Sequence, residues 1–291
     1  MPSPACAHHA FWRTALCAVI AVACWVAAAG PGNAAEDRCV AVSRAPGEPS
    51  VRKARYSAGS SIVPAQFIPP KAPNEAIRIT FVGHSTFVIE SRQGVKIATD
   101  YNDYIRPAEL PDIATMNRAH TSHFTDQPDP LIPNVLRGWN PAGGPARHDL
   151  TVKDVRVRNL PTNIRSYASG GTDEFGNSIF IFEMGALCIA HLGHLHHTLS
   201  PRQIGQIGVM DVVLAPVDGS YTLDTPGMIE VLKALKAPLI IPMHYFSSFT
   251  LDRFLETARA DFEIETSTTA SITVTRSTLP RKPKVLVLPG S

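Results

Sequence analysis

Short apolar segments separated by turn residues constrain the fold of this chain more than any other feature of its sequence. Residues 77–82, 86–90 and 95–99 have the alternating or short apolar patterns that are typical of β-strands, and a Gln-Gly turn separates the last two. Further strands are predicted at 152–158, 177–184, 186–191, 209–215, 238–242, 270–276 and 284–288. The chain is therefore rich in strands from residue 76 onward.

Helices are predicted only in the second half of the chain, at 201–207, 226–235 and 251–260, where they alternate with strands. Strands followed by alternating helices and strands predict an α/β protein. We expect a four-layer α/β/β/α sandwich, with two facing sheets and helices outside.

Residues 101–150 are predicted to be mostly loop, because prolines interrupt them repeatedly. A loop of this length inside a compact domain is usually functional. The 25 prolines of the chain also argue against a helical bundle.

The N-terminus has the layout of a secretory signal. An apolar run at 15–29 is followed by small residues at 32–35, where a signal peptidase would cut. The run is about 15 residues long, which is shorter than the roughly 20 that span a bilayer. We therefore expect a cleaved signal peptide at 1–35 and no stable membrane span after cleavage. A lipoprotein anchor at Cys24 is disfavoured, because Ala21 stands where a larger aliphatic residue is usual.

An extended arm is predicted at 36–75, where Pro, Ser, Ala and Arg are frequent and no periodicity is sustained. The folded domain is predicted at 76–291. With a cleaved signal, the protein would be secreted or periplasmic.

Two cysteines, Cys39 and Cys188, remain outside the leader. A disulfide between them is conceivable in an oxidising compartment. However, Cys188 lies in an apolar strand, which favours a buried cysteine that simply packs.

The net charge of +2 gives no electrostatic reason to expect nucleic acid as a partner. The sequence does not indicate an oligomeric state.

Histidines gather at the predicted strand ends and in the loops between them. They are His84, His120, His123, His191, His194, His196, His197 and His244. His196 and His197 are expected to be solvated loop residues. Imidazole beside a carboxylate binds zinc, iron or manganese well. Several separated segments that each offer a histidine at a strand end indicate a metal site.

Four motifs resemble the metallo-β-lactamase superfamily. Residues 82–90 read VGHSTFVIE and are followed by IATD at 97–100, residues 189–194 read IAHLGH, and residues 241–245 read IPMHY. A further strand at 209–215 leads into VDGSYT. Their order most resembles the ascorbate-6-phosphate lactonase-like (UlaG-like) branch of zinc-dependent hydrolases. The resemblance covers roughly residues 76–290 and implies the sandwich fold and a metal-dependent hydrolase.

The chain departs from the superfamily's central HxHxDH motif. If Asp126 is the aspartate of that motif, its histidines should lie at Ser122, Phe124 and Gln127. None of these is histidine, although His120 and His123 lie nearby. His194 replaces the aspartate of the family's HLGD turn, and no histidine lies at 161–164.

The resemblance and these departures together suggest a rebuilt site with one metal. His123, His194 and His244, with Asp126 or His120, could hold zinc and leave room for a water. Manganese or iron would also suit these ligands. Asp126 or Asp100 would orient the water or act as its base. A second group of residues is expected to orient the ligands or line the pocket. This group is His84, His191, Asp218 and Tyr221.

The expected function is an exported hydrolase of a small molecule with a lactone, ester or phosphodiester bond. One alternative is a metal-free, non-catalytic binding protein on the same scaffold. Another is an iron site that handles redox chemistry or oxygen.

Overall fold

The computed structural model describes residue 39, residues 76–166 and residues 169–290. The predicted signal peptide at 1–35 lies outside the described residues, and so does the predicted arm at 36–75 apart from Cys39. All the described residues belong to one compact unit.

A six-stranded sheet forms the first layer, in the order β13-β1-β2-β3-β4-β5. Its strands are β1 (Ile77–Gly83), β2 (Thr86–Glu90), β3 (Lys96–Ala98), β4 (Ile113–Met116), β5 (Asn134–Arg137) and β13 (Ser271–Val274). The first strands form an antiparallel meander, whereas β3, β4 and β5 run parallel. The loops that follow β3 and β4 therefore emerge at the same edge of the sheet.

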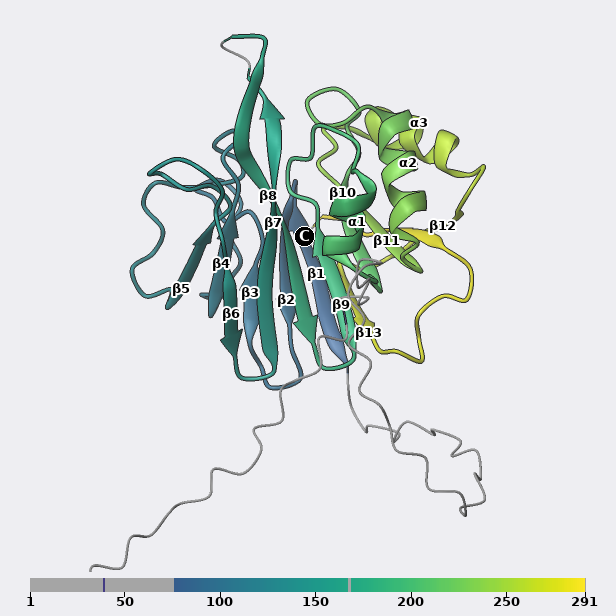
Figure 1. Cartoon of the computed structure of the whole chain (residues 1–291). Helices are drawn as coiled ribbons and strands as arrows, with labels where there is room; N and C mark the ends of the chain where they lie inside the picture. The colour runs from purple at the N-terminus through teal and green to yellow at the C-terminus, as the bar shows by residue number, and fades with distance from the viewer. Residues whose placement is uncertain (1–38, 40–75, 167–168, 291) are drawn as a thin grey trace, which may run out of the picture. The chain divides into compact units, whose positions relative to one another are not determined.

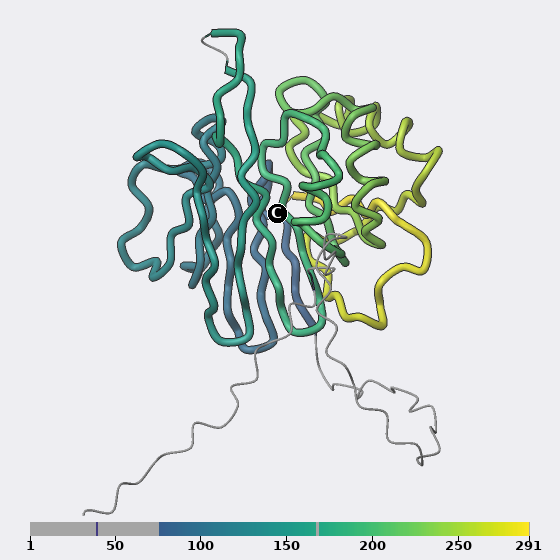
Figure 2. The backbone as a smooth tube through the Cα atoms, in the orientation of Figure 1, coloured from purple at the N-terminus to yellow at the C-terminus, as the bar shows by residue number. Residues whose placement is uncertain are grey.

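An eight-stranded sheet forms the second layer, in the order β12-β14-β11-β10-β9-β8-β7-β6. Its strands are β6 (Asp149–Val152), β7 (Val155–Arg165), β8 (Thr172–Met184), β9 (Leu187–His191), β10 (Val212–Pro216), β11 (Leu239–Met243), β12 (Glu263–Thr266) and β14 (Lys284–Val287). The paired ends of β7 and β8 extend beyond the neighbouring strands (Figure 2).

Three helices in the described residues pack on the outer face of the eight-stranded sheet, beside β10 and β11 (Figure 1). They are α1 (Pro201–Ile207), α2 (Thr225–Leu235) and α3 (Ser248–Ala258). Ser200, Asp224 and Ser247 cap their N-termini by accepting a hydrogen bond from a first-turn amide. No helix in this part of the chain is long and apolar enough to cross a bilayer.

The main core lies between the sheets, where Phe81 and Phe87 of the first sheet join Phe180 and Phe182 of the second. A second core fills the space between the other face of the eight-stranded sheet and the helices. Central strands such as β10 are buried on both faces, which explains their continuous apolar sequence. The predicted α/β fold with two facing sheets is confirmed, and the helices of the described residues all cover the eight-stranded sheet.

The prediction of loop over 101–150 missed β4, β5 and the start of β6. Strand β4 reads IATM and is buried at every position, so its sequence does not alternate. Strand β12 was also missed, since most of its residues are exposed and polar. Pairing with a neighbouring strand defines these short segments, and that pairing is not visible locally.

Cys39 and Cys188 form a disulfide, so the expectation that Cys188 only packs is wrong. Cys39 is buried against the second core, and its carbonyl accepts a hydrogen bond from the Val209 amide (2.8 Å). The bridge joins a residue far upstream of the first strand to β9, across a separation of 149 residues.

Replacement of both cysteines by serine should lower the free energy of unfolding by about 2–5 kcal/mol, because the bridge restricts a long loop in the unfolded chain. Urea denaturation of the oxidised protein, the reduced protein and the double variant measures the effect. The denaturation midpoint of the reduced protein should equal that of the double variant. Equal midpoints for all three would contradict a stabilising bridge.

Candidate metal centre

Four histidines converge where the loops of both sheets meet. His84 lies in the turn between β1 and β2, His120 and His123 lie in the loop after β4, and His244 follows β11. Each offers one ring nitrogen, and these four nitrogens lie within 4.8 Å of one another. This spacing brings together enough nitrogen ligands for one metal ion.

A buried carboxylate orients His123. The Nδ1 atom of His123 donates to Oδ2 of Asp100 (2.5 Å), and the other carboxylate oxygen accepts from Nδ2 of Asn117 (3.0 Å). Both His123 and Asp100 are fully buried. Asp100 lies two residues beyond β3, so the end of that strand helps to fix the position of its side chain.

A second carboxylate, Asp218, orients His244. Both residues lie in loops that follow strands of the eight-stranded sheet. The Nδ1 atom of His244 donates to Oδ1 of Asp218 (3.0 Å). The same carboxylate accepts from the Thr222 hydroxyl (2.5 Å) and from the backbone amides of Ser220 (2.9 Å) and Tyr221 (2.6 Å). Asp218 therefore stabilises the loop that follows it and also orients the imidazole of His244.

The Nε2 atoms of His123 and His244 are buried and have no hydrogen-bond partner among the described residues. Because Nδ1 of each ring carries the proton, Nε2 of each presents a lone pair. An unsatisfied buried nitrogen is costly. A carboxylate on one ring nitrogen and a metal on the other is the usual arrangement of a histidine ligand. These two histidines therefore fit a metal ion.

Ser122 connects the other two histidines of the group. Its hydroxyl lies 3.0 Å from Nε2 of His84 and 2.7 Å from Nδ1 of His120. His84 has a positive φ of 50°, and its carbonyl accepts a hydrogen bond from the His244 amide (2.6 Å). This hydrogen bond joins the β1–β2 turn of the six-stranded sheet to the end of β11 in the eight-stranded sheet.

His194 lies next to the group but outside it. Its Nε2 atom is 2.9 Å from Nε2 of His120, and its Nδ1 atom is 2.5 Å from Nε2 of His196. His196 in turn accepts a hydrogen bond on Nδ1 from the Arg165 amide (2.8 Å). A row of three imidazoles therefore runs from the group to the β7–β8 hairpin.

His191 uses both of its ring nitrogens on the backbone. Nε2 donates to the Ser85 carbonyl (3.0 Å), and Nδ1 accepts from the Gly193 amide (3.2 Å). It supports the two loops that carry the site and has no nitrogen left for a metal.

Asn117 and Gly193 make a close junction between the sheets. The Oδ1 atom of Asn117 accepts from the Ser178 amide of β8 (2.8 Å), while its Nδ2 atom binds Asp100. Gly193 has φ +61°, and an added Cβ would collide with the side chains of Asn117 and Asn177. A glycine is required here by both conformation and space.

Burial disfavours the charged form of His84, His123, His194 and His196. It lowers the pKa of His84 and that of His196 to about 4, and it lowers the pKa of His123 and His194 well below the ordinary value. Neutral imidazole is the form that binds a metal.

The two carboxyl groups respond differently to burial. Desolvation raises the pKa of Asp100. Burial would also raise the pKa of Asp218, but hydrogen bonds from His244, Thr222 and Ser220 hold it well below its usual range. Asp218 is therefore the firmly ionised partner.

The structure brings some of the residues that the sequence suggested into one group and places others outside it. His120, His123 and His244 come together as expected, and His84 joins them directly. Asp126 is exposed and lies outside the group, so the expectation that it ligates the metal and acts as base is corrected. Its loop turns its side chain to solvent. Asp100 is placed as an orienting partner, because both of its oxygens are engaged.

Several contributors were missed from sequence. Ser85 and Ser122 were given no role, Asn117 was not singled out, and His196 was expected to be a solvated loop residue. No local signal indicated Asn117, because β4, the strand that it follows, was itself not predicted. Asp218 was expected near the pocket, and its contact with His244 makes that expectation more specific.

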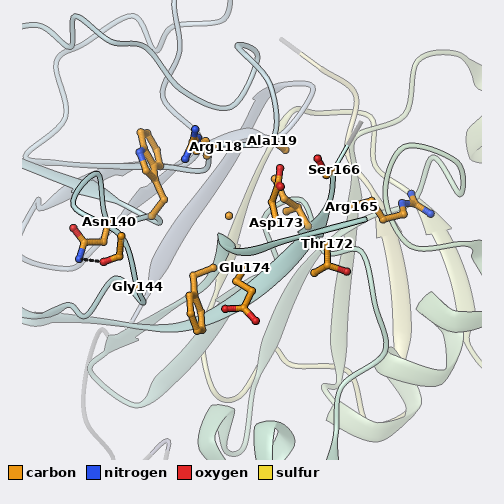
Figure 3. A pocket seen from close by; sticks show the side chains of 14 residues that line it. Arg118, Ala119, Asn140, Gly144, Arg165, Ser166, Thr172, Asp173 and Glu174 are labelled. Atoms are coloured by element: carbon orange, nitrogen blue, oxygen red, sulfur yellow. Dashed lines mark hydrogen bonds between the residues drawn. The ribbon is translucent and has the colours of Figure 1, made fainter. Parts of the chain in front are cut away.

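A pocket of about 540 Å³ adjoins the site. Figure 3 shows Arg118, Asn140, Asp173 and Glu174 among the residues that line it. Two residues of its wall, Arg118 and Ala119, directly precede His120 in the chain, and a third, Arg165, donates its backbone amide to His196. The site thus has room beside it for a small molecule.

The metal-free protein should lose stability as pH falls from about 6.5 to about 4. His84 and His196 have folded pKa values near 4, below the unfolded value of 6.5, so the unfolded state binds more protons in this window. Thermal unfolding in a chelator, followed by circular dichroism, gives the slope. The slope should be shallower in a His84→Gln, His196→Gln variant, and equal slopes would contradict the assignment.

Comparisons with known proteins agree with this geometry. A metal-dependent hydrolase of Thermoplasma acidophilum is 26% identical over 205 residues, which cover 62% of this chain and 87% of the relative. A similar hydrolase of Ignicoccus hospitalis is 24% identical over 198 residues, with 58% and 82% covered.

Solved structures share the fold. A structure from Thermotoga maritima, assigned to the Zn-dependent hydrolases of the metallo-β-lactamase superfamily, matches with a TM-score of 0.54 and 28% identity, covering 73% of this chain and 98% of that one. A metallo hydrolase of Ignicoccus hospitalis matches with a TM-score of 0.50 and 20% identity, covering 74% and 97%.

A family model described as a beta-lactamase superfamily domain matches residues 78–244. The match begins in β1 and ends at His244, so it includes every histidine of the site. Because it covers more than half of the chain, the protein belongs to the beta-lactamase superfamily.

Proposed function

We propose that the protein is an exported metal-dependent hydrolase that acts on a small molecule with a lactone, ester or phosphodiester bond. The observation that carries the proposal is the pair of buried, unpartnered Nε2 atoms on His123 and His244, each opposite a buried carboxylate. The names of the relatives support hydrolysis as the reaction.

A single metal ion is the arrangement that these ligands favour. His123 and His244 would hold it, and His84 or His120 would supply a third nitrogen. Zinc held by three nitrogens keeps a position open for water, and manganese or iron is the alternative. A bound divalent ion supplies Lewis acidity, which polarises a scissile bond and lowers the pKa of water.

The remaining residues would hold and orient these ligands. Asp100 and Asp218 fix the proton on Nδ1 of their histidines, which leaves Nε2 free for the ion. His194 stands where the family's HLGD turn has an aspartate, and its contact with His120 supports a role in orienting that ring. The absence of an aspartate at this position is a further argument for one ion instead of two.

The type of scissile bond is proposed from the lactonase-like (UlaG-like) resemblance. The pocket beside His120 offers Arg118 and two carboxylates, so a polar small molecule would fit there. The same site without a metal would be a binding pocket, which is the alternative function.

Export is supported by two independent features. The apolar run at 15–29 has the pattern of a signal peptide. The disulfide between Cys39 and Cys188 is of a kind that persists in oxidising compartments. Secretion or residence in the periplasm follows, and N-terminal sequencing of the exported protein would test it.

Elemental analysis of the protein, purified without added metal, should find about one divalent ion per chain. A His123→Ala, His244→Ala variant should lose the ion, because it removes both open nitrogens. A His148→Ala variant is the matched control. His148 contacts the Arg137 carbonyl (2.7 Å) and lies outside the group, so this variant should keep the ion.

Hydrolysis of a lactone, an ester and a phosphodiester should then be measured on the metal-loaded protein. Turnover of one class, lost in the double variant and kept in the control, is the expected result. Metal binding without turnover would favour a binding protein. No metal in the wild-type protein after reconstitution would contradict the proposal.

A further inference from the structure

Two half-exposed aromatic rings border the histidine group. Tyr221 is 52% exposed and Phe246 is 55% exposed. Their ring centroids are 5.4 Å apart in an edge-to-face arrangement. The Phe246 ring also lies 5.5 Å from the ring of His84 and 5.3 Å from that of His244. Apolar surface therefore reaches the histidine group while it remains open to solvent.

The loops that carry these rings are held firmly. The backbone of 220–222 is bound from inside by Asp218, and its three carbonyls accept from Nη2 of Arg165 at 2.7–2.9 Å. Phe246 lies between His244 and Ser247, the residue that caps α3. The carbonyl of Asp218 also accepts from Nη2 of Arg253 of that helix (2.7 Å).

An aromatic ring that is held in place and left half exposed gains free energy when a ligand covers it. Single exposed apolar residues are normal on a protein surface. Two exposed rings in contact, beside a buried polar group, instead indicate a binding surface. The pocket at Arg118 offers charged groups to a substrate, whereas Tyr221 and Phe246 offer apolar ring surface.

We propose that Tyr221 and Phe246 form a subsite for an aryl or other flat apolar group of the substrate, next to the bond that is cleaved. This inference rests on the proposed metal-dependent function. It specifies the substrate class as a small molecule whose hydrolysable group carries an apolar substituent.

Two metal-binding probes that differ only in the apolar group test the subsite. Acetohydroxamate and benzohydroxamate are titrated by calorimetry into the metal-loaded full chain. Benzohydroxamate should bind about tenfold or more tightly than acetohydroxamate, because the phenyl group covers aromatic surface. Phe246→Ala and Tyr221→Ala should each reduce this ratio, and the double variant should bring it close to one.

Tyr104→Ala is the matched control. Tyr104 is 73% exposed and lines a different pocket, over the six-stranded sheet, so this variant should keep the wild-type ratio. Unfolding curves establish that each variant is folded, and Phe246→Leu should restore part of the ratio.

The outcomes separate the subsite from the metal function. Equal binding of both probes to a metal-loaded chain would overturn the subsite and leave the metal site intact. A ratio that the double variant does not change would also overturn it. If the chain takes up no metal and binds neither probe, the proposed function fails and the subsite fails with it.

Discussion

The hydrogen bonds from two buried carboxylates to two buried imidazoles are the interactions on which the site depends. Asp100 holds His123 from the six-stranded sheet, and Asp218 holds His244 from the eight-stranded sheet. Each bond fixes a proton on Nδ1 and leaves Nε2 open. Because the two pairs come from opposite sheets, the open nitrogens meet only when the sandwich is closed. The fold therefore assembles the site.

This arrangement costs stability in the metal-free chain. Burial disfavours protonation of the imidazoles, and two buried nitrogens lack partners among the described residues. Such groups persist where they serve a function, since a bound ion removes the penalty. His194 lies against His120 through Nε2 and against His196 through Nδ1, so neutral imidazoles continue beyond the histidine group.

Much of the fold could be predicted from the sequence, because strands such as β1 and β10 have strong local patterns. The same holds for His244, which directly follows β11, and for Asp100, which lies two residues beyond β3. The loop after β4 could not be predicted. Its motif placed Asp126 at the metal, whereas packing turns Asp126 to solvent and brings His120, Ser122 and His123 inward. The disulfide was missed for a similar reason, since pairing across 149 residues leaves no local signal.

The most direct test of this account is the metal affinity of the Asp100→Asn and Asp218→Asn variants, measured by competition with a chelator of known affinity. Asparagine keeps the shape of the side chain but removes the charge that holds the Nδ1 proton. The account predicts that each variant binds the ion about 10–100-fold more weakly than wild type. An Asp154→Asn control should be unchanged, because Asp154 contacts Ser91, which lies at the end of β2 away from the His84 turn. Wild-type affinity in both site variants would contradict the central role of the carboxylate–imidazole pairs.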